Sequence, residues 1–464
     1  MNYDFLIIGG GSAGYAAART AASLGLKTCV VDGAEELGGL CILRGCMPSK
    51  AILESAGRYA TLRRAREFGL RAGGLEIRGD EILARKRRLI GGFAAYRREQ
   101  LAGGKFDLVR GHASFVDPHT VEISLRDGGT QRLTAGAILL ATGSVVSDVP
   151  LPAMKEIGCW TSDDLLESGE IPESVIVLGG GATAVEFATY YAGLGRGVTV
   201  IQRGDQLLKG TDPDVAGALA GGFRARGVKI FTGTRLVGAG RAGNLKRIIF
   251  EHEGRKKSAE AGQVLHTLGR SPNIRGLGIE AAEIEMTNGR PAMKATQQTS
   301  QPHIFAAGDV SGPFEVVHIA IQQGEVAARN AARLLAGGRE PLEEMDYRLK
   351  LVAVFSDPEV AAVGQSESEL RRAGVEFRSA SHPFNDHGKS LCMGETDGFV
   401  KLITATGTGE ILGAACVGPH AVELIHEVVV AMRFRATAAQ LADTPHYHPT
   451  LSEIWTYPAE ELAV

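Results

Sequence analysis

Two cysteines five residues apart are the feature of the sequence most directly suited to chemistry. They are Cys41 and Cys46, in the segment GGLCILRGCMPSK. On a regular helix such residues are about 140° apart around the axis, with Cα atoms beyond the roughly 7 Å that a disulfide bridges. Gly45 and Pro48 can interrupt the helix and close this gap. The spacing therefore predicts a strained or accessible disulfide that is easily reduced, with two ordinary buried thiols as the alternative.

Thiol exchange needs a base, because an unperturbed thiol with a pKa near 8.5 is largely protonated at pH 7. The segment HYHPTLSE near the carboxyl end offers His448, which Glu453 could orient. Thr450 and Glu453 also fit a helix capping box, which would give Glu453 a purely structural task. A metal site at His446 and His448 is disfavoured, because no matching cysteine or carboxylate set accompanies them.

A glycine-rich turn precedes the cysteine pair. Gly9, Gly11 and Gly14 form a GxGxxG pattern between an apolar strand and an Ala-rich helix, and Asp32 ends the next strand. This arrangement is typical of a dinucleotide site: the glycines allow close approach to the pyrophosphate, the helix amino terminus offers N–H donors, and the carboxylate accepts from ribose hydroxyls. A glycine turn with only a structural role is the alternative.

The same pattern recurs 170 residues later. Gly179 and Gly181 repeat the glycine positions, and Gln202 with Arg203 stands where Asp32 stood. Without a carboxylate there, Arg203, and Lys209 six residues on, could pair with a 2′-phosphate. The second site is therefore expected to take NAD(P)(H), with a slight preference for NADP(H). A solvent-facing Arg203 is the alternative, and two dinucleotide sites in one chain suggest a bound flavin and an exchangeable nicotinamide.

Two charged residues lie in otherwise apolar or helical surroundings. Lys50 ends the cysteine segment, and Glu186 is on the helix of the second glycine loop. Unpaired burial of either charge would be costly, so a mutual ion pair near the flavin is expected. Two exposed charges are the alternative.

Composition limits the classes to which the protein can belong. Fifty basic and 53 acidic side chains leave a net charge of −3, which argues against a general nucleic-acid binder. Six cysteines in 464 residues are too few for a disulfide scaffold. No stretch approaches the roughly 20 apolar residues of a membrane span, and the amino terminus lacks a signal-peptide pattern. We therefore expect a cytoplasmic protein with no nucleic-acid or membrane partner.

Five motifs in order resemble the pyridine nucleotide-disulfide oxidoreductase family over essentially the whole chain. GGLCILRGCMPSK resembles the redox disulfide motif, ATGS and AAGDVSG two flavin-site motifs, TLGRSPN a strand end between them, and HPTLSE the active-site base motif. The resemblance implies an α/β fold with two Rossmann-like dinucleotide-binding domains and an α+β carboxyl-terminal dimerisation domain. The implied boundaries are an FAD domain at 1–145, an NAD(P) domain at 146–264, a central domain at 265–340 and an interface domain at 341–464.

The resemblance also assigns roles. Cys41 would be the interchange thiol, Cys46 the thiol beside the flavin, and His448, supported by Glu453, the acid/base donated by the other subunit of a homodimer. Asp309 would hold the ribityl chain of FAD, and Lys50 with Glu186 would lie by the flavin ring. The remaining cofactor positions that the motifs imply are Ala113, Thr142, Gly143, Gly269 and His318.

Within the family, HPTLSE and His318 look most like dihydrolipoamide dehydrogenases, whose substrate is a free or protein-bound lipoyl dithiol. Ala182 stands where glutathione reductases tend to have Tyr, and no cysteine pair follows Cys416 as mercuric reductases require. Three alternatives remain: an NADPH-dependent reductase of a low-molecular-weight disulfide, a flavin transhydrogenase that needs no cysteines, and a catalytically lapsed nucleotide-binding assembly subunit.

Overall fold

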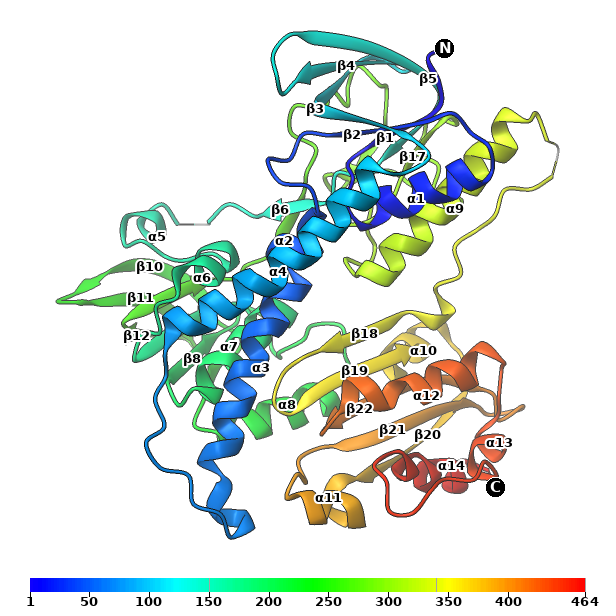
Figure 1. The fold of residues 1–464 in the computed structure, drawn as a ribbon. Helices are drawn as coiled ribbons and strands as arrows, with labels where there is room; N and C mark the ends of the chain where they lie inside the picture. The colour runs from blue at the N-terminus through cyan, green and yellow to red at the C-terminus, as the bar shows by residue number, and fades with distance from the viewer. Residues whose placement is uncertain (150, 339, 464) are drawn as a thin grey trace. The chain divides into compact units, whose positions relative to one another are not determined.

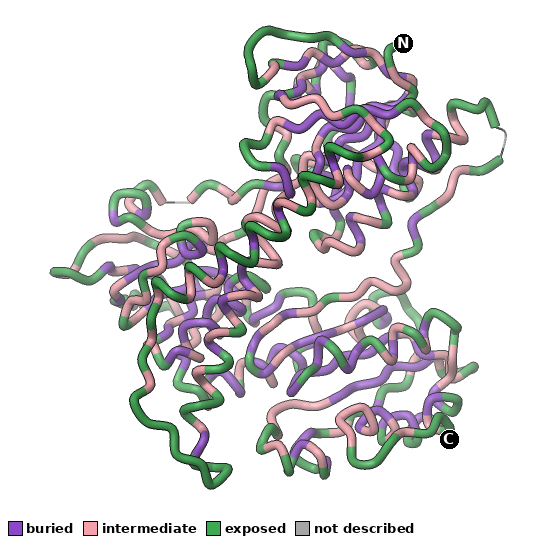
Figure 2. Tube along the Cα trace, viewed as in Figure 1, coloured by how far each residue is buried: buried purple, intermediate pink, exposed green. Residues whose placement is uncertain are grey.

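The computed structural model describes residues 1–149, 151–338 and 340–463, and the chain divides into two compact units (Figure 1). The first unit comprises Met1–Pro48, Ala84–Ser147 and Arg270–Asp346, and the second comprises Ser49–Leu83, Asp148–Gly269 and Tyr347–Val464. Each unit has its own buried core, coloured purple in Figure 2.

A parallel sheet forms the centre of the first unit. Strand β1 pairs in parallel with both β2 and β5, while β3 lies beyond β2 and β17 beyond β5. Strand β4 lies between the long strands β3 and β5 and pairs with both of them in the antiparallel direction. The strands are β1 (Tyr3–Ile8), β2 (Thr28–Asp32), β3 (Asp107–Asp117), β4 (Thr120–Leu125), β5 (Thr130–Leu140) and β17 (Ile304–Ala306).

Two helices cover one face of this sheet. Helices α1 (Ser12–Ser23) and α9 (Val317–Leu335) lie side by side in Figure 1, and their alanines pack on Phe5, Ile7 and Phe305. Alanine side chains are small, so the helices can approach the strands closely. The remaining elements that lie wholly or partly in this unit are α2 (Gly39–Arg44), α3 (Cys46–Arg63), α4 (Gly79–Ala102), β6 (Ser144–Val146), β14 (Arg270–Pro272), β15 (Met286–Thr287) and β16 (Arg290–Pro291).

A second parallel sheet lies in the second unit, in the order β13-β7-β8-β9. Its pairing repeats that of the first sheet: Phe5 pairs with Thr28 there, and Val175 pairs with Val198 here, both shifted by the 170 residues that relate the two glycine patterns. The elements of this part are β7 (Ser174–Leu178), α7 (Ala182–Gly193), β8 (Gly197–Ile201), α8 (Pro213–Ala225), β9 (Lys229–Phe231), β13 (Gln263–His266), α5 (Ala153–Glu156), α6 (Ser162–Ser168), β10 (Arg235–Ala242), β11 (Leu245–His252) and β12 (Arg255–Ala261).

The carboxyl-terminal part of the second unit is an antiparallel sheet in the order β18-β19-β22-β21-β20, packed against helices. The predicted α/β class with a carboxyl-terminal α+β part is confirmed. The elements are η2 (Tyr347–Leu349), β18 (Leu351–Val354), β19 (Glu359–Gly364), α10 (Glu367–Ala373), β20 (Phe377–Pro383), η3 (Phe384–Asp386), α11 (Gly388–Met393), β21 (Phe399–Ala405), β22 (Ile411–Gly418), α12 (Ala421–Arg433), α13 (Ala438–Ala442), η4 (Ser452–Trp455) and α14 (Thr456–Leu462).

A buried lysine joins the two parts of the second unit. Lys401 on β21 is only 4% exposed, and its Nζ lies 3.0 Å from Oδ2 of Asp212 and 2.8 Å from Oδ2 of Asp214, at the start of α8. Burial by itself lowers the pKa of Lys401, but the carboxylates of Asp214 and Asp212 outweigh it and raise that pKa. The cation is therefore held charged, and its loss would leave Asp212 buried without a counter-ion.

We expect Lys401→Ala to lower the free energy of unfolding by about 3 kcal/mol, because an uncompensated charge would remain buried. Urea unfolding followed by circular dichroism measures this loss. Arg235→Ala is the matched control: Arg235 is 71% exposed and pairs with Glu251 on the surface, so its loss should cost less than about 1 kcal/mol. Equal costs for the two variants would contradict the expectation.

Candidate functional site

The first glycine loop has the shape that its spacing predicts. It connects β1 to α1, and a Cβ atom on Gly14 would lie 1.8 Å from the carbonyl oxygen of Gly9. Only glycine permits this contact between the helix and the loop. A Cβ atom on Gly11 would meet nothing closer than the Cα of Gly39 at 3.9 Å, so the backbone there has space in front of it. The loop can therefore accept a pyrophosphate against the amino terminus of α1.

Asp32 holds this loop from the end of β2. Its Oδ2 accepts a hydrogen bond from the N–H of Gly10 at 2.8 Å, and its Oδ1 accepts from the N–H of Ala34 at 2.8 Å. The carboxylate is therefore fixed at the edge where a ribose would lie, and each oxygen keeps a second lone pair. The bond from Asp32 to a ribose hydroxyl stays a prediction.

Polar groups gather where β5 and β17 end. The hydroxyl of Ser144 donates to Oδ2 of Asp309 at 2.6 Å and accepts from Nε of Arg270 at 2.8 Å. The neighbouring Thr142 hydroxyl is buried, and it has no hydrogen-bond partner among the residues that the structure describes. A buried hydroxyl without a partner is rare in proteins, so this atom and the open glycine loop fit a bound dinucleotide.

The two cysteines lie on different helices. Helix α2 ends at Arg44, Gly45 takes φ −132° and ψ −113°, and α3 begins at Cys46. A Cβ atom on Gly45 would lie 3.3 Å from the Cα of Cys41, so glycine lets the two helices meet at this point. The predicted interruption is therefore at Gly45.

The expectation that Pro48 also interrupts the helix is wrong. It is the third residue of α3, within the first turn, where its missing N–H costs no helical hydrogen bond.

Three of the other cysteines are in surroundings that suppress thiol exchange. Burial raises the pKa of Cys29 to about 12 and that of Cys159 to about 11, and it also raises the pKa of the fully buried Cys416. These three groups remain protonated near neutral pH. Cys392 is exposed, while Cys41 and Cys46 are both half-buried.

The second glycine loop connects β7 to α7. No heavy atom in the described part of the chain lies within 4 Å of a Cβ position on Gly181, which leaves room for a second pyrophosphate. Gln202 directly follows β8, and its Nε2 donates to the carbonyl of Gln206 at 3.3 Å. Arg203 and Lys209 are both exposed on this side of the loop.

The predicted ion pair between Lys50 and Glu186 is present. The Nζ of Lys50 lies 2.8 Å from both carboxylate oxygens of Glu186, whose side chain is 9% exposed. Phe355 completes the cluster: its N–H donates to Oε1 of Glu186 at 3.2 Å, and Nζ of Lys50 lies 4.6 Å from its ring centre. No charge or spacing pattern in the sequence marks Phe355.

His448 and Glu453 are in contact, as predicted. Nδ1 of His448 lies 3.0 Å from Oε2 of Glu453, and the His448 side chain is 80% exposed. The capping box of Thr450 and Glu453 is wrong: this segment forms the short 3-10 helix η4, whose N-cap is Leu451, and the carboxylate of Glu453 faces imidazoles instead of backbone N–H groups.

The neighbouring histidine has a different partner. Nε2 of His446 contacts Oε1 of Glu427 on α12, and Nδ1 of His446 lies 2.8 Å from the carbonyl of Thr444. This pair fixes the loop that carries His448. The sequence did not reveal the role of Glu427, because the period of an amphipathic helix does not distinguish it from a surface residue. No group of three or more His, Cys, Asp or Glu side chains in the described residues could hold a metal ion.

The predicted site residues divide between the two units. The first unit holds Gly9, Gly11, Gly14, Asp32, Cys41, Cys46, Ala113, Thr142, Gly143, Asp309 and His318. The second holds Lys50, Gly179, Gly181, Glu186, Gln202, Arg203, Lys209, Gly269, His448 and Glu453. Ala113 is a buried residue of β3, His318 is the second residue of α9, and Gly269 takes a positive φ of 120° after β13.

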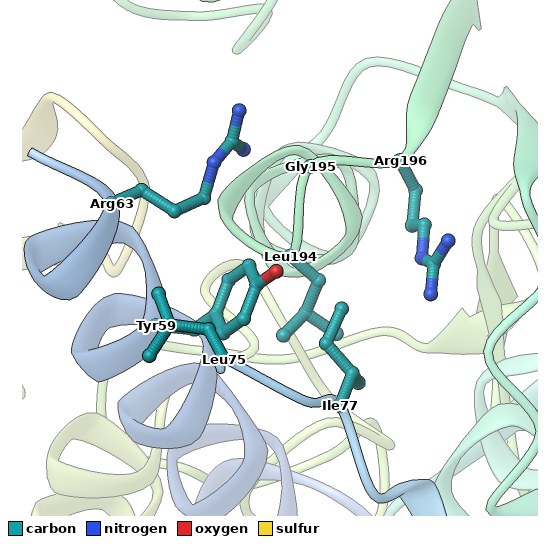
Figure 3. Close-up of a pocket in the computed structure, with 7 residues that line it drawn as sticks. All are labelled: Tyr59, Arg63, Leu75, Ile77, Leu194, Gly195 and Arg196. Atoms are coloured by element: carbon teal, nitrogen blue, oxygen red, sulfur yellow. The ribbon is translucent and has the colours of Figure 1, made fainter. Parts of the chain in front are cut away.

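A cavity of about 390 Å³ lies elsewhere in the second unit (Figure 3). None of its lining residues belongs to the predicted site, and the guanidinium groups of Arg63 and Arg196 point away from each other. Arg196 pairs with Glu173 at 2.6 Å. The lining residues are Tyr59, Arg63, Leu75, Ile77, Leu194, Gly195 and Arg196.

Within the described part of the chain, every helix is too short or too polar to cross a bilayer.

Comparison with known proteins places these features in a family. The family model described as pyridine nucleotide-disulphide oxidoreductase matches residues 3–324, and the dimerisation-domain model of the same family matches residues 352–459. A dihydrolipoyl dehydrogenase of Bacillus subtilis is 34% identical over 461 residues, which cover 97% of this chain and 96% of the relative. Another from Geobacillus stearothermophilus is 35% identical over 460 residues, 98% of this chain and 95% of that one.

Solved structures agree. The crystal structure of LpdA from Mycobacterium tuberculosis superposes with a TM-score of 0.87 at 31% identity and covers 99% of both chains. The HOCl-induced flavoprotein disulfide reductase RclA from Escherichia coli shares the fold, with a TM-score of 0.84 at 24% identity and 99% of both chains covered. Since the family models span nearly the whole chain, the protein belongs to the pyridine nucleotide-disulphide oxidoreductase family and is a flavin-dependent disulfide oxidoreductase that uses FAD and NAD(P).

Proposed function

We propose that this enzyme acts on a dihydrolipoyl dithiol, as the names of its relatives state for them, and delivers the electrons to NAD(P)⁺. The observation that supports the proposal is the glycine break at Gly45: it separates Cys41 on α2 from Cys46 at the start of α3, and α2 itself begins next to the first glycine loop. Two half-buried cysteines in that position suit thiol exchange. The lapsed-subunit alternative has no observation in its favour, and the exposed Arg203 after β8 is the one feature that fits the NADPH-dependent, glutathione reductase-like alternative.

The proposed exchange starts from a disulfide between the two cysteines. A substrate thiolate attacks Sγ of Cys41, the bond between Cys41 and Cys46 breaks, and Cys46 leaves as a thiolate. The second substrate thiolate then attacks the substrate sulfur of the mixed disulfide, which releases Cys41 and the oxidised substrate. His448 takes the proton of the first substrate thiol, with Glu453 holding its imidazole, and the proton of the second thiol passes to the released Cys41 thiolate. Two electrons have then moved from the substrate to the cysteine pair.

The electrons leave through the two dinucleotides. The first glycine loop, Asp32, the Thr142–Ser144 turn and Asp309 would hold FAD, which would supply a carrier able to accept an electron pair from a dithiol and give a hydride to nicotinamide. The ion pair of Lys50 and Glu186 is proposed to lie by the flavin ring, and the second glycine loop to hold the nicotinamide dinucleotide. The positions of Ala113, Gly143, Gly269 and His318 in cofactor binding, and the division into four domains, stay predictions.

The cysteines are tested by substitution. We expect Cys41→Ser and Cys46→Ser each to lower dihydrolipoamide:NAD(P)⁺ turnover by roughly 10³-fold or more, because each removes one of the exchanging sulfurs. Reduction of an artificial acceptor such as ferricyanide by NAD(P)H should persist, because hydride transfer to the flavin needs neither sulfur. Cys392→Ser, at an exposed cysteine, is the matched control. Normal dithiol turnover by Cys46→Ser would refute the role proposed here.

The dimerisation domain and the relatives support a homodimer, and we propose that His448 serves the cysteine pair of the partner. Its side chain is 80% exposed in one protomer, as an imidazole that acts across an interface would be. In a two-fold dimer the two protomers exchange this residue reciprocally.

A heterodimer of two variants distinguishes a His448 that serves the partner's cysteine pair from a His448 that serves the pair of its own chain. One protomer carries Cys46→Ser and the other carries His448→Gln, so an exchange between subunits leaves one intact site and about half of the wild-type dithiol turnover. Each variant homodimer has no intact site. Turnover of differently tagged, co-purified heterodimers is the measurement, and a heterodimer as inactive as its parents would place His448 in its own subunit's site.

The nicotinamide preference depends on the position after β8. We propose that the second site uses NADP(H) and that Arg203 contacts its 2′-phosphate. The exposure of Arg203 just after β8 supports this proposal. Arg203→Ala should then raise the KM for NADPH about tenfold or more while leaving the KM for NADH within twofold. Lys155→Ala, at a lysine outside the predicted site, is the control. If NADH is strongly preferred by the wild type and Arg203→Ala changes neither KM, the second site is an NAD site.

A further inference from the structure

A buried histidine, His387, contacts Glu453 on the side that faces the core of the second unit. His387 is the N-cap residue of α11, and its side chain is 0% exposed. Its Nδ1 lies 2.8 Å from the hydroxyl of Ser390, and its Nε2 lies 3.4 Å from Oε1 of Glu453. Within the described residues this Nε2 makes no hydrogen bond, so its 3.4 Å approach to Oε1 of Glu453 is an electrostatic contact. Its closest charged neighbour is therefore the carboxylate that contacts His448.

The surroundings select one form of the His387 ring. Burial lowers the pKa of His387, so the ring is neutral near pH 7 and carries one proton. A bare lone pair on Nε2 would face the carboxylate of Glu453 unfavourably. The stable tautomer accepts from the Ser390 hydroxyl at Nδ1 and directs Nε2–H at Glu453.

Glu453 thus lies between two imidazoles. Its Oε2 is 3.0 Å from Nδ1 of His448 and its Oε1 is 3.4 Å from Nε2 of His387. The exposed fraction of the side chain falls from 80% at His448 to 12% at Glu453 and 0% at His387. The three groups form a row from the surface into the core of the second unit.

We propose that His387 is a positioning residue for the thiol-exchange reaction: its Nε2–H anchors Oε1 of Glu453, so that Oε2 stays aimed at Nδ1 of His448. This inference rests on the proposed function, in which Nε2 of His448 takes the substrate proton. Without the anchor, the carboxylate can rotate about its last bond, and the imidazole of His448 loses its fixed orientation.

Other titratable groups also face His387. His382 on β20 stacks on Tyr457 of α14 with ring centres 4.0 Å apart, and Tyr457 lies edge-on to His387 with a centre distance of 6.3 Å. His382 and His448 both act on His387 electrostatically. His382 does not reach the carboxylate, since its Nε2 lies 3.1 Å from the carbonyl of Asp386, so it provides a control next to the site.

The test compares His387→Leu with His387→Gln in the FAD-loaded dimer. Leucine removes the donor, so we expect kcat for dihydrolipoamide oxidation to fall about tenfold with KM within twofold. We expect the acidic limb of the kcat–pH profile to move to higher pH, because a carboxylate that loses a donor gains a proton more readily. Glutamine keeps an N–H near the position of Nε2 and should restore most of kcat and the original limb.

His382→Leu is the matched control and should keep the wild-type kcat and pH profile. A His387→Leu enzyme with the wild-type kcat and the wild-type pH profile would overturn the inference. Equal losses in the leucine and glutamine variants with an unmoved acidic limb would also overturn it, because they would indicate a packing role. Thermal unfolding and flavin absorbance establish that each variant is folded and loaded.

If the His387→Leu variant does not fold, the Ser390→Ala variant is tested in its place. That variant removes the group that fixes the tautomer of His387, so kcat should fall and the acidic limb should shift in the same direction, while wild-type behaviour would refute the inference. His448→Gln separates this inference from the proposed function. If His448→Gln turns over dithiol like the wild type, the proposed base is wrong, whatever the His387 variants do.

Discussion

The contact between Gly14 and Gly9 determines where the chemistry of the first unit can lie. The start of α1 is so close to the loop that a Cβ on Gly14 would be 1.8 Å from the carbonyl oxygen of Gly9. This approach keeps the helix amino terminus directly after β1 and leaves the backbone at Gly11 uncovered. Asp32 then ties the loop to β2 through the N–H of Gly10 at 2.8 Å. The position available to a cofactor follows from this geometry.

Two kinds of charge pair occur among the buried residues of the second unit. Lys401 with Asp212 and Asp214 connects secondary-structure elements and keeps the unit folded. Lys50 with Glu186 joins two residues that the sequence assigns to the flavin site, and Glu453 lies between His387 and His448, the histidine that the sequence assigns to the reaction. Burial alone therefore does not distinguish a structural charge from a functional one, and the chemistry of the neighbouring groups decides.

The features marked by a motif or by a charge in apolar surroundings were predictable from the sequence, and contacts made by residues outside any such pattern were not. The 170-residue offset between the glycine motifs predicted a second copy of the strand–turn–helix pattern, and the cost of an unpaired buried charge predicted the ion pair of Lys50 and Glu186. By contrast, the capping box predicted at Glu453 is wrong, because the segment folds as a short 3-10 helix. Phe355 contacts Glu186 although 169 residues separate them in the chain. His387 contacts Glu453 although strands β21 and β22 lie between them in the sequence. Neither residue belongs to a motif, so only the packed structure brings them to the carboxylates.

The high exposure of His448 indicates what the carboxyl-terminal site still needs in order to act on a thiol. A base that works on a thiol must be oriented and kept from exchanging its proton with bulk water, yet this imidazole is 80% exposed in one protomer. Its inner side is fixed by Glu453, and its loop is fixed by His446 and Glu427. The groups that orient the proposed base thus come from its own chain, and in the proposed dimer the partner would exclude water from Nε2. A dimer in which the partner covers this face satisfies both requirements at once.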